Sequence, residues 1–182
     1  RSSKGIELRV HPTLIPEEEL LANVNGVKNA VLVQANAVGP TLYYGAGAGA
    51  GPTASAVVAD VVDIVRDIIY TEDGSGTIPQ LAFEALSDLH ILSSDEMTTG
   101  YYLRLNAEDQ TGVLADVTTI LSRTGISIDA IMQQPRLKDL IPIVILTDPI
   151  VESKMNEAIA QIQALPAIHG EIVRIRLELL DN

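Results

Sequence analysis

Apolar and polar positions follow their most regular pattern in residues 100–182. Apolar residues at every second position are typical of strands with one buried face, and they predict four strands in this region. The predicted strands cover residues 101–107, 126–133, 140–147 and 173–179. Helical spacing predicts one helix that begins at Val113 and is stopped by a left-handed Gly125, and a second that begins at Asp148-Pro149. The order βαββαβ is that of a ferredoxin-like α+β sandwich, with both helices on one face of an antiparallel sheet.

The preceding part, residues 1–70, has a weaker pattern. The pattern predicts strands over 6–10, 30–38 and 41–44, a short helix that opens at Pro16, and a long helix over about 53–70. The long helix is apolar nearly all round, apart from a stripe formed by Asp60, Asp63, Arg66 and Asp67. Such a helix needs burial on most of its circumference, and residues 1–70 hold too few apolar positions to cover it. We therefore expect a covering surface that this segment does not contain.

An acidic stretch separates these two parts. Residues 71–100 carry six acidic and no basic side chains, and turn-favouring clusters there flank a short helix expected over 78–92. We therefore expect a first domain over 1–70, a linker over 71–99 and a second domain over 100–182.

Composition narrows the possible function classes. The chain has no cysteine, which excludes disulfides, thiolate nucleophiles and cysteine-based zinc sites. Its three histidines stand far apart in sequence, so we expect no metal site. The net charge of −12 disfavours nucleic-acid binding, which needs clustered Lys and Arg, and Arg174 and Arg176 are expected to be exposed charges. No apolar run approaches the roughly 20 residues of a membrane span and no signal segment opens the chain, so we expect a soluble cytoplasmic protein.

Four glycines alternate with alanines between the third predicted strand and the long helix, at Gly45, Gly47, Gly49 and Gly51. Spacing alone leaves two interpretations open. Residues without a Cβ let a backbone approach a ligand closely, and the amides at the following helix start favour a phosphate. Equally, small residues allow a strand and a helix to pack closely. The match to a dinucleotide-binding motif is weak, because Pro52 removes one amide and no acidic residue follows at the end of a next strand.

Two segments resemble the homoserine dehydrogenase family. Residues 5–16 are similar to the segment just beyond that family's catalytic region, and residues 44–60 are similar to its C-terminal glycine loop and helix. In the family this loop returns to the Rossmann domain and touches the nicotinamide coenzyme, NAD or NADP. The resemblance therefore implies coenzyme contact at Gly49 with support from Gly45 and Gly47, and a long helix that packs on the Rossmann sheet. It also implies that the catalytic lysine lies upstream, so we assign no catalytic residue here and expect the chain alone to be inactive.

Residues 100–182 resemble an ACT domain, the module that senses amino acids in many biosynthetic enzymes. The resemblance is carried by residues 106–114, which run from the first predicted strand into the first helix. Glycine clears space there, helix-start amides suit the carboxylate of an amino acid, and acceptor side chains suit its ammonium group. The expected effector-binding residues are Asp109, Gln110, Gly112, Val113, Leu114 and Ser127. Ser127, together with Asp129, is expected to complete the pocket across a dimer interface.

Taken together, the resemblances imply the C-terminal part of a homoserine dehydrogenase, which interconverts aspartate semialdehyde and homoserine with NAD(P). They imply a homo-oligomer, formed through ACT and catalytic-region surfaces, and feedback control by an amino acid, with threonine as the leading candidate. One alternative is a free-standing ACT protein that binds an amino acid without a catalytic partner. Another is a nucleotide-binding protein that uses the glycine loop. Many ACT domains only hold subunits together, so assembly without sensing also stays open.

Overall fold

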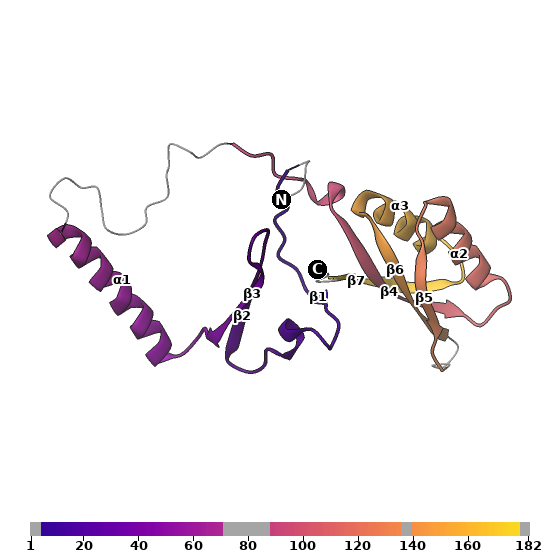
Figure 1. Ribbon diagram of the computed structural model, residues 1–182. Coiled ribbons are helices and arrows are strands. Elements are labelled where there is room, and N and C mark those ends of the chain that lie inside the picture. Colours follow the sequence, from indigo (N-terminus) through magenta and orange to yellow (C-terminus); the bar gives the residue numbers. More distant parts are fainter. Residues whose placement is uncertain (1–4, 71–87, 136–139, 179–182) are drawn as a thin grey trace. The chain divides into compact units, whose positions relative to one another are not determined.

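The computed structural model describes residues 5–70, 88–135 and 140–178 (Figure 1). The chain divides into two compact units: one groups residues 1–16 with 89–181, and the other spans 17–88. Each unit has a sheet of its own.

The larger unit is built on a five-stranded sheet with the order β1-β7-β4-β6-β5. Its strands are β1 (Thr13–Leu14), β4 (Thr98–Glu108), β5 (Ile128–Gln133), β6 (Leu140–Val151) and β7 (Ile168–Leu177). Neighbouring strands are antiparallel, except that β1 runs parallel to β7. Two helices, α2 (Val113–Arg123) and α3 (Glu152–Gln163), pack on one face of the sheet (Figure 1). The predicted βαββαβ order and α+β class are confirmed, and β1 is an addition at the edge beside β7.

Alternate residues of β4 supply the centre of the core. Tyr101, Leu103 and Leu105 are fully buried beneath the two helices. Helical spacing brings one apolar stripe of each helix onto them: Val113, Val117 and Leu121 from α2, and Met155, Ala158 and Ile162 from α3. Each fully buried Leu, Ile or Val contributes about 1.5–3 kcal/mol relative to exposure, so this layer is the main source of stability. Gly125 has φ +78° just after α2, as predicted for a left-handed helix stop.

The start of α3 differs from the prediction. Asp148-Pro149 does not cap a helix but lies inside β6, which continues to the residue before α3. The β4–β6 register shifts at this point, so that the pair faces the single residue Gly100. A β-bulge is one of the few places where a sheet tolerates proline, because the ladder is already interrupted there. The helix begins instead at Glu152, whose backbone N–H donates to the carbonyl of Met97 at 2.8 Å.

The strand predicted over 6–10 is wrong. Ile6 makes a single bridge to Ile91, and the rest of this stretch is irregular. Leu8 and Val10 are exposed, so their alternation with polar residues does not mark a buried face. The segment reaches a sheet only further along, where β1 pairs with β7. It therefore packs with the larger unit, whereas the expected domain boundaries placed it in the first domain.

The smaller unit is a hairpin followed by a long helix. A 3-10 helix, η1 (Leu20–Asn23), begins later than the helix predicted at Pro16. β2 (Lys28–Ala35) and β3 (Gly39–Ala46) pair in antiparallel fashion, and Gly39, with φ +76°, lets the turn between them close. α1 (Ala50–Tyr70) follows the glycine loop. The short helix expected over 78–92 lies mostly outside the described residues, and residues 88–92 are not helical.

α1 leaves most of its apolar surface uncovered. Eight large apolar side chains on it are 40–73% exposed: Val57, Val58, Val61, Val62, Ile64, Val65, Ile68 and Ile69. A helix that is apolar nearly all round is normally buried, and an exposed patch of this kind marks an interaction surface. A covering surface for α1 therefore stays a prediction.

Candidate coenzyme loop and effector pocket

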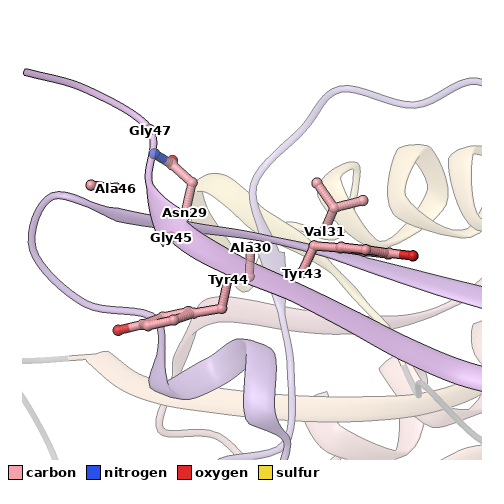
Figure 2. A pocket seen from close by; sticks show the side chains of 8 residues that line it. All are labelled: Asn29, Ala30, Val31, Tyr43, Tyr44, Gly45, Ala46 and Gly47. Atoms are coloured by element: carbon pink, nitrogen blue, oxygen red, sulfur yellow. The ribbon is translucent and has the colours of Figure 1, made fainter. Parts of the chain in front are cut away.

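The glycine loop leads from β3 into α1, and a hollow of about 260 Å³ lies beside its start (Figure 2). The lining residues are Asn29, Ala30, Val31, Tyr43, Tyr44, Gly45, Ala46 and Gly47. Figure 2 shows the side-chain amide of Asn29 reaching toward the backbone at Gly47. A Cβ added at Gly47 would lie 1.9 Å from Asn29 Nδ2 and 2.7 Å from Asn29 Cγ. Any side chain at Gly47 would therefore displace the amide of Asn29.

The backbone requires a glycine at position 49 but not at position 45. Gly49 has φ +125°, which L side chains rarely adopt, and its carbonyl accepts a hydrogen bond from Thr53 N at 3.1 Å in the first turn of α1. Gly45 has no positive φ, and a Cβ there would meet nothing within 4 Å. Backbone conformation therefore accounts for a glycine at position 49, and close packing against Asn29 accounts for one at position 47. Nothing in the described residues accounts for a glycine at position 45.

The turn between β4 and α2 encloses a pocket of about 100 Å³. Its lining residues are Ala107, Glu108, Asp109, Gln110, Gly112, Val113, Leu114, Gln133, Ile141 and Ile143. Gly112 is the N-cap of α2 with φ +98°, and the first amides of any helix have no acceptor within the helix. Of the six predicted effector residues, the structure brings five together here, all except Ser127. A helix start of this kind suits a carboxylate.

Sequence reasoning missed Glu108, although it lies within the segment 106–114. The Glu108 carboxylate accepts from Gln110 Nε2 at 2.6 Å and lies 2.7 Å from His169 Nε2. It stands beside Asp109 in the pocket wall and gives the site a second acidic side chain. His169 could not be found from spacing, because only the β4–β7 pairing brings it to this turn.

Ser127 does not line this pocket within one chain. It lies just before β5, where its carbonyl accepts from Asp148 N at 3.2 Å, and the other end of β5 supplies Gln133 to the pocket. β4 and β5 are both antiparallel to β6, so they run in the same direction. The last residues of β4 and β5 therefore lie at the pocket end of the sheet, and Ser127, which precedes β5, lies at the opposite end. A contribution from Ser127 across a dimer interface stays a prediction.

A buried ion cluster ties the start of α3 to the sheet. Glu152 is only 3% exposed; Arg176 Nε donates to its Oε2 at 3.0 Å, and Arg174 Nη2 lies 3.5 Å from its Oε1. The Tyr101 hydroxyl donates to the same carboxylate at 3.3 Å. The prediction that both arginines are exposed charges is wrong. They pair in register with Tyr101 and Leu103, which places them on the helix-covered face of the sheet.

The electrostatics of this cluster favour its charged form. Burial by itself would raise the pKa of the Glu152 carboxyl, but the hydrogen bonds and positive charge of Arg176, together with Arg174, outweigh burial and hold that pKa below its usual 4.5. Burial, and then the negative charge of Glu152, raise the pKa of Tyr101 to about 12, so the phenol keeps its proton and donates. The Glu152 carboxyl is therefore ionised at neutral pH and accepts hydrogen bonds from Arg176 and Tyr101.

The described residues show no further site of a familiar kind. They contain no group of three His, Cys, Asp or Glu side chains placed to hold a metal ion. On the polar stripe of α1, formed by Asp60, Asp63, Arg66 and Asp67, the Asp63 carboxylate lies 3.5 Å from the Arg66 guanidinium and so forms an ion pair. No helix in the described ranges is long and apolar enough to cross a membrane.

Comparison with known proteins assigns both parts of the chain. Residues 2–62 match the family model for homoserine dehydrogenase, and residues 101–164 match the model for the ACT domain. The whole chain is 52% identical to a homoserine dehydrogenase of Pseudomonas aeruginosa and 50% identical to one of Neisseria gonorrhoeae, and spans 42% of the length of each. This chain corresponds to the C-terminal part of homoserine dehydrogenases. A solved homoserine dehydrogenase from Thiobacillus denitrificans agrees with all of it at a TM-score of 0.89 and 55% identity, over 41% of that structure's chain.

The two family matches and the two compact units divide the chain differently. The homoserine dehydrogenase match includes residues 5–16, which pack through β1 on the sheet of the larger unit. Because the ACT match also lies in the larger unit, we call that unit the ACT unit. The ACT match runs from β4 to just past α3, and β7 lies beyond it although β7 completes the sheet. Thr13 and Leu14, which lie within the first match, are therefore joined to the sheet of the larger unit by backbone pairing.

Proposed function

We propose that this chain is the part of a cytoplasmic homoserine dehydrogenase that completes the coenzyme site and regulates the enzyme. The whole enzyme would interconvert aspartate semialdehyde and homoserine, with NAD or NADP supplying or accepting the hydride. The observation that carries this proposal is the match of the whole chain, glycine loop and ACT unit together, to homoserine dehydrogenases. The catalytic lysine and the first coenzyme motif would lie in the region upstream, so the chain alone would be inactive.

The proposed coenzyme contact is best supported at Gly45. Gly45 lines the hollow beside β3, and no atom of the described residues lies within 4 Å of a Cβ placed there. A coenzyme that approaches the backbone closely supplies the missing reason for glycine at this position. Gly49 would shape the turn into α1, and Gly47 would keep the loop in place against Asn29. Two of the expected roles are thus exchanged: the resemblance implied the coenzyme contact at Gly49 with support from Gly45, whereas here Gly45 would contact the coenzyme and Gly49 would support the loop.

Gly45→Ala in the whole enzyme is therefore expected to raise the KM for the coenzyme by about tenfold, equivalent to about 1.4 kcal/mol, and to leave the KM for homoserine nearly unchanged. The melting temperature should stay near the wild-type value, because the new methyl group meets no atom of the described residues within 4 Å. Gly51→Ala is the matched control, since a Cβ there also meets nothing within 4 Å. Equal, small effects of both variants on the coenzyme KM would favour the packing interpretation of the loop.

For the ACT unit, we propose that the pocket at the β4–α2 turn binds a free amino acid, with threonine as the leading candidate. The helix-start amides of Val113 and Leu114 would receive the carboxylate. Glu108 and Asp109 would receive the ammonium group, which suits charge-assisted hydrogen bonds. A volume of about 100 Å³ admits only a small ligand.

We further propose that the ACT unit pairs with a second copy along β5. β5 ends the strand order of the sheet, so within the described residues its outer edge has no neighbouring strand. An exposed edge of this kind favours pairing with another chain. A two-fold axis would make the β5 strands antiparallel and bring the partner's Ser127 toward Gln133 at the pocket. This arrangement would give Ser127 the role predicted for it, and α1 would supply a second apolar surface for the catalytic region.

One observation favours a second candidate function, assembly without sensing. Glu108 already accepts a hydrogen bond from Gln110 and lies against His169, so an ammonium group would have to share or replace these contacts. The pocket would then be a closed polar turn that supports a dimer. Ligand-dependent stabilisation distinguishes the two functions.

A further inference from the structure

The side chain of Gln163 makes two hydrogen bonds to the backbone of β7. Gln163 is the last residue of α3, and its Nε2 donates to the carbonyl of Gly170 at 2.5 Å. Its Oε1 accepts from the backbone N–H of Ile172 at 3.0 Å. One planar amide thus satisfies a carbonyl and an N–H that stand two residues apart on the same strand.

This pair of bonds has the pattern of strand pairing. In a parallel ladder, one residue donates its N–H to a carbonyl on the neighbouring strand and accepts, at its own carbonyl, the N–H two residues further on. The Gln163 amide makes the same two bonds to β7, on either side of Glu171. It therefore takes the place of one residue of an adjoining strand.

The stretch that Gln163 engages is the irregular part of β7. The β4–β7 register shifts between Arg104 and Asn106, so that one residue of β4 faces the three residues 170–172 of β7. A bulge leaves backbone groups without ladder partners, and such groups also invite a strand from another molecule. At this bulge, the Gln163 side chain provides hydrogen-bond partners for the carbonyl of Gly170 and the N–H of Ile172.

The far end of the same edge is closed by β1. Thr13 and Leu14 pair in parallel with Arg176 and Leu177, and the Thr13 hydroxyl donates to the carbonyl of Arg176 at 3.0 Å. Glu178 N donates to the carbonyl of Leu14 at 3.0 Å. Both stretches of the β7 edge are thus covered by the chain itself, whereas β5 has no such cover among the residues described.

We propose that Gln163 seals the β7 edge against strand addition, so that strand-to-strand association between copies of this chain is confined to the β5 edge. The seal depends only on the contacts of Gln163. The choice of edge rests on the proposed homo-oligomer. Two separate measurements therefore test the two parts.

The seal is tested by amide hydrogen exchange in the full chain. Gln163→Ala should speed exchange at Ile172 by at least about fivefold, because the backbone N–H of Ile172 loses the Gln163 Oε1 acceptor. Gln161→Ala is the matched control, since Gln161 lies on the same helix and donates to Glu157 of that helix, at 3.4 Å. The control should leave Ile172 at the wild-type rate. Equal exchange rates in the two variants would overturn the seal.

The choice of edge is tested by light scattering over a range of concentrations. Wild type and Gln161→Ala should give one oligomer, and Gln163→Ala should form larger species as the concentration rises, because residues 170–172 of β7 are then open to strand addition as well as the β5 edge. Met132→Lys, which puts a charge on β5, should weaken the wild-type oligomer without changing exchange at Ile172. Faster exchange in Gln163→Ala without larger species would show that the seal does not control association. A wild type that stays monomeric would contradict the proposed homo-oligomer and the choice of the β5 edge. The hydrogen-exchange result at Ile172 would then test the role of Gln163 on its own.

Discussion

Glu152→Ala is expected to lower the free energy of unfolding by about 3 kcal/mol, at the low end of the range for removing one partner of a buried ion pair. The variant leaves Arg176 and Arg174 without their carboxylate and removes the acceptor of the Tyr101 hydroxyl. The low end applies because the arginine side chains are 21% and 28% exposed, so water can partly replace the lost partner. Urea unfolding followed by far-ultraviolet circular dichroism measures the loss.

Glu157→Ala is the matched control for this prediction. Glu157 lies on the same helix and forms an exposed pair with Lys154 at 3.3 Å. Exposed pairs of this spacing contribute less than about 0.5 kcal/mol, so the control should unfold nearly as the wild type does. A Glu152→Ala variant as stable as Glu157→Ala would show that the cluster does not hold α3 to the sheet.

The same cluster predicts the direction of a pH effect. Because the folded-state pKa of Glu152 is below its ordinary 4.5, its contribution is fully present above that value and is lost as the pH falls through the folded-state pKa. The stability difference between wild type and Glu152→Gln should therefore be constant near neutral pH and shrink in acid. A difference that grows as the pH falls would contradict the assigned charge state.

Threonine at about 100 times its dissociation constant is expected to stabilise the folded chain by about 2.7 kcal/mol, if it binds only to the folded state. The increase should appear as a higher melting temperature with threonine and not with lysine or methionine, because the pocket of about 100 Å³ excludes long side chains. Asp109→Ala should abolish the shift. Asp116→Ala is the control, since Asp116 lies in the first turn of α2 but does not line the pocket.

Gly112→Val tests the same pocket, but its baseline must be measured separately. Gly112 has φ +98°, so valine would destabilise the chain even without ligand. The relevant quantity is the shift on adding threonine to each variant, which should vanish in Gly112→Val. No shift with any amino acid at millimolar concentration, in wild type or variants, would support the ACT unit as an assembly device alone.

Periodicity predicted the ACT unit well because its elements each bury one face. The apolar stripes of α2 and α3 and the alternation of Tyr101, Leu103 and Leu105 correspond directly to the observed core. The same rule failed at Leu8 and Val10, whose alternation serves no buried face. It failed again at Pro149, because a proline that opens a helix and a proline in a bulge look alike in sequence.

The candidate sites were predictable only where one local segment supplies them. The residues from Asp109 to Leu114 follow one another along the chain, so the turn could be recognised from its sequence. Glu152 and Arg176 meet only through the packing of α3 on β7, and no spacing rule joins them. The contact between Asn29 and Gly47 likewise depends on the hairpin register, in which Asn29 faces Gly45.

The rate of homoserine-dependent coenzyme reduction tests the central claim most directly. The chain alone should give no turnover above the blank. A chimera in which this chain replaces the matching 42% of the Pseudomonas aeruginosa homoserine dehydrogenase, to which it is 52% identical, should oxidise homoserine at a rate comparable to the parent enzyme. Turnover by the chain alone, or a folded chimera without homoserine oxidation, would contradict the assignment of this chain as the coenzyme-closing and regulatory part of the enzyme.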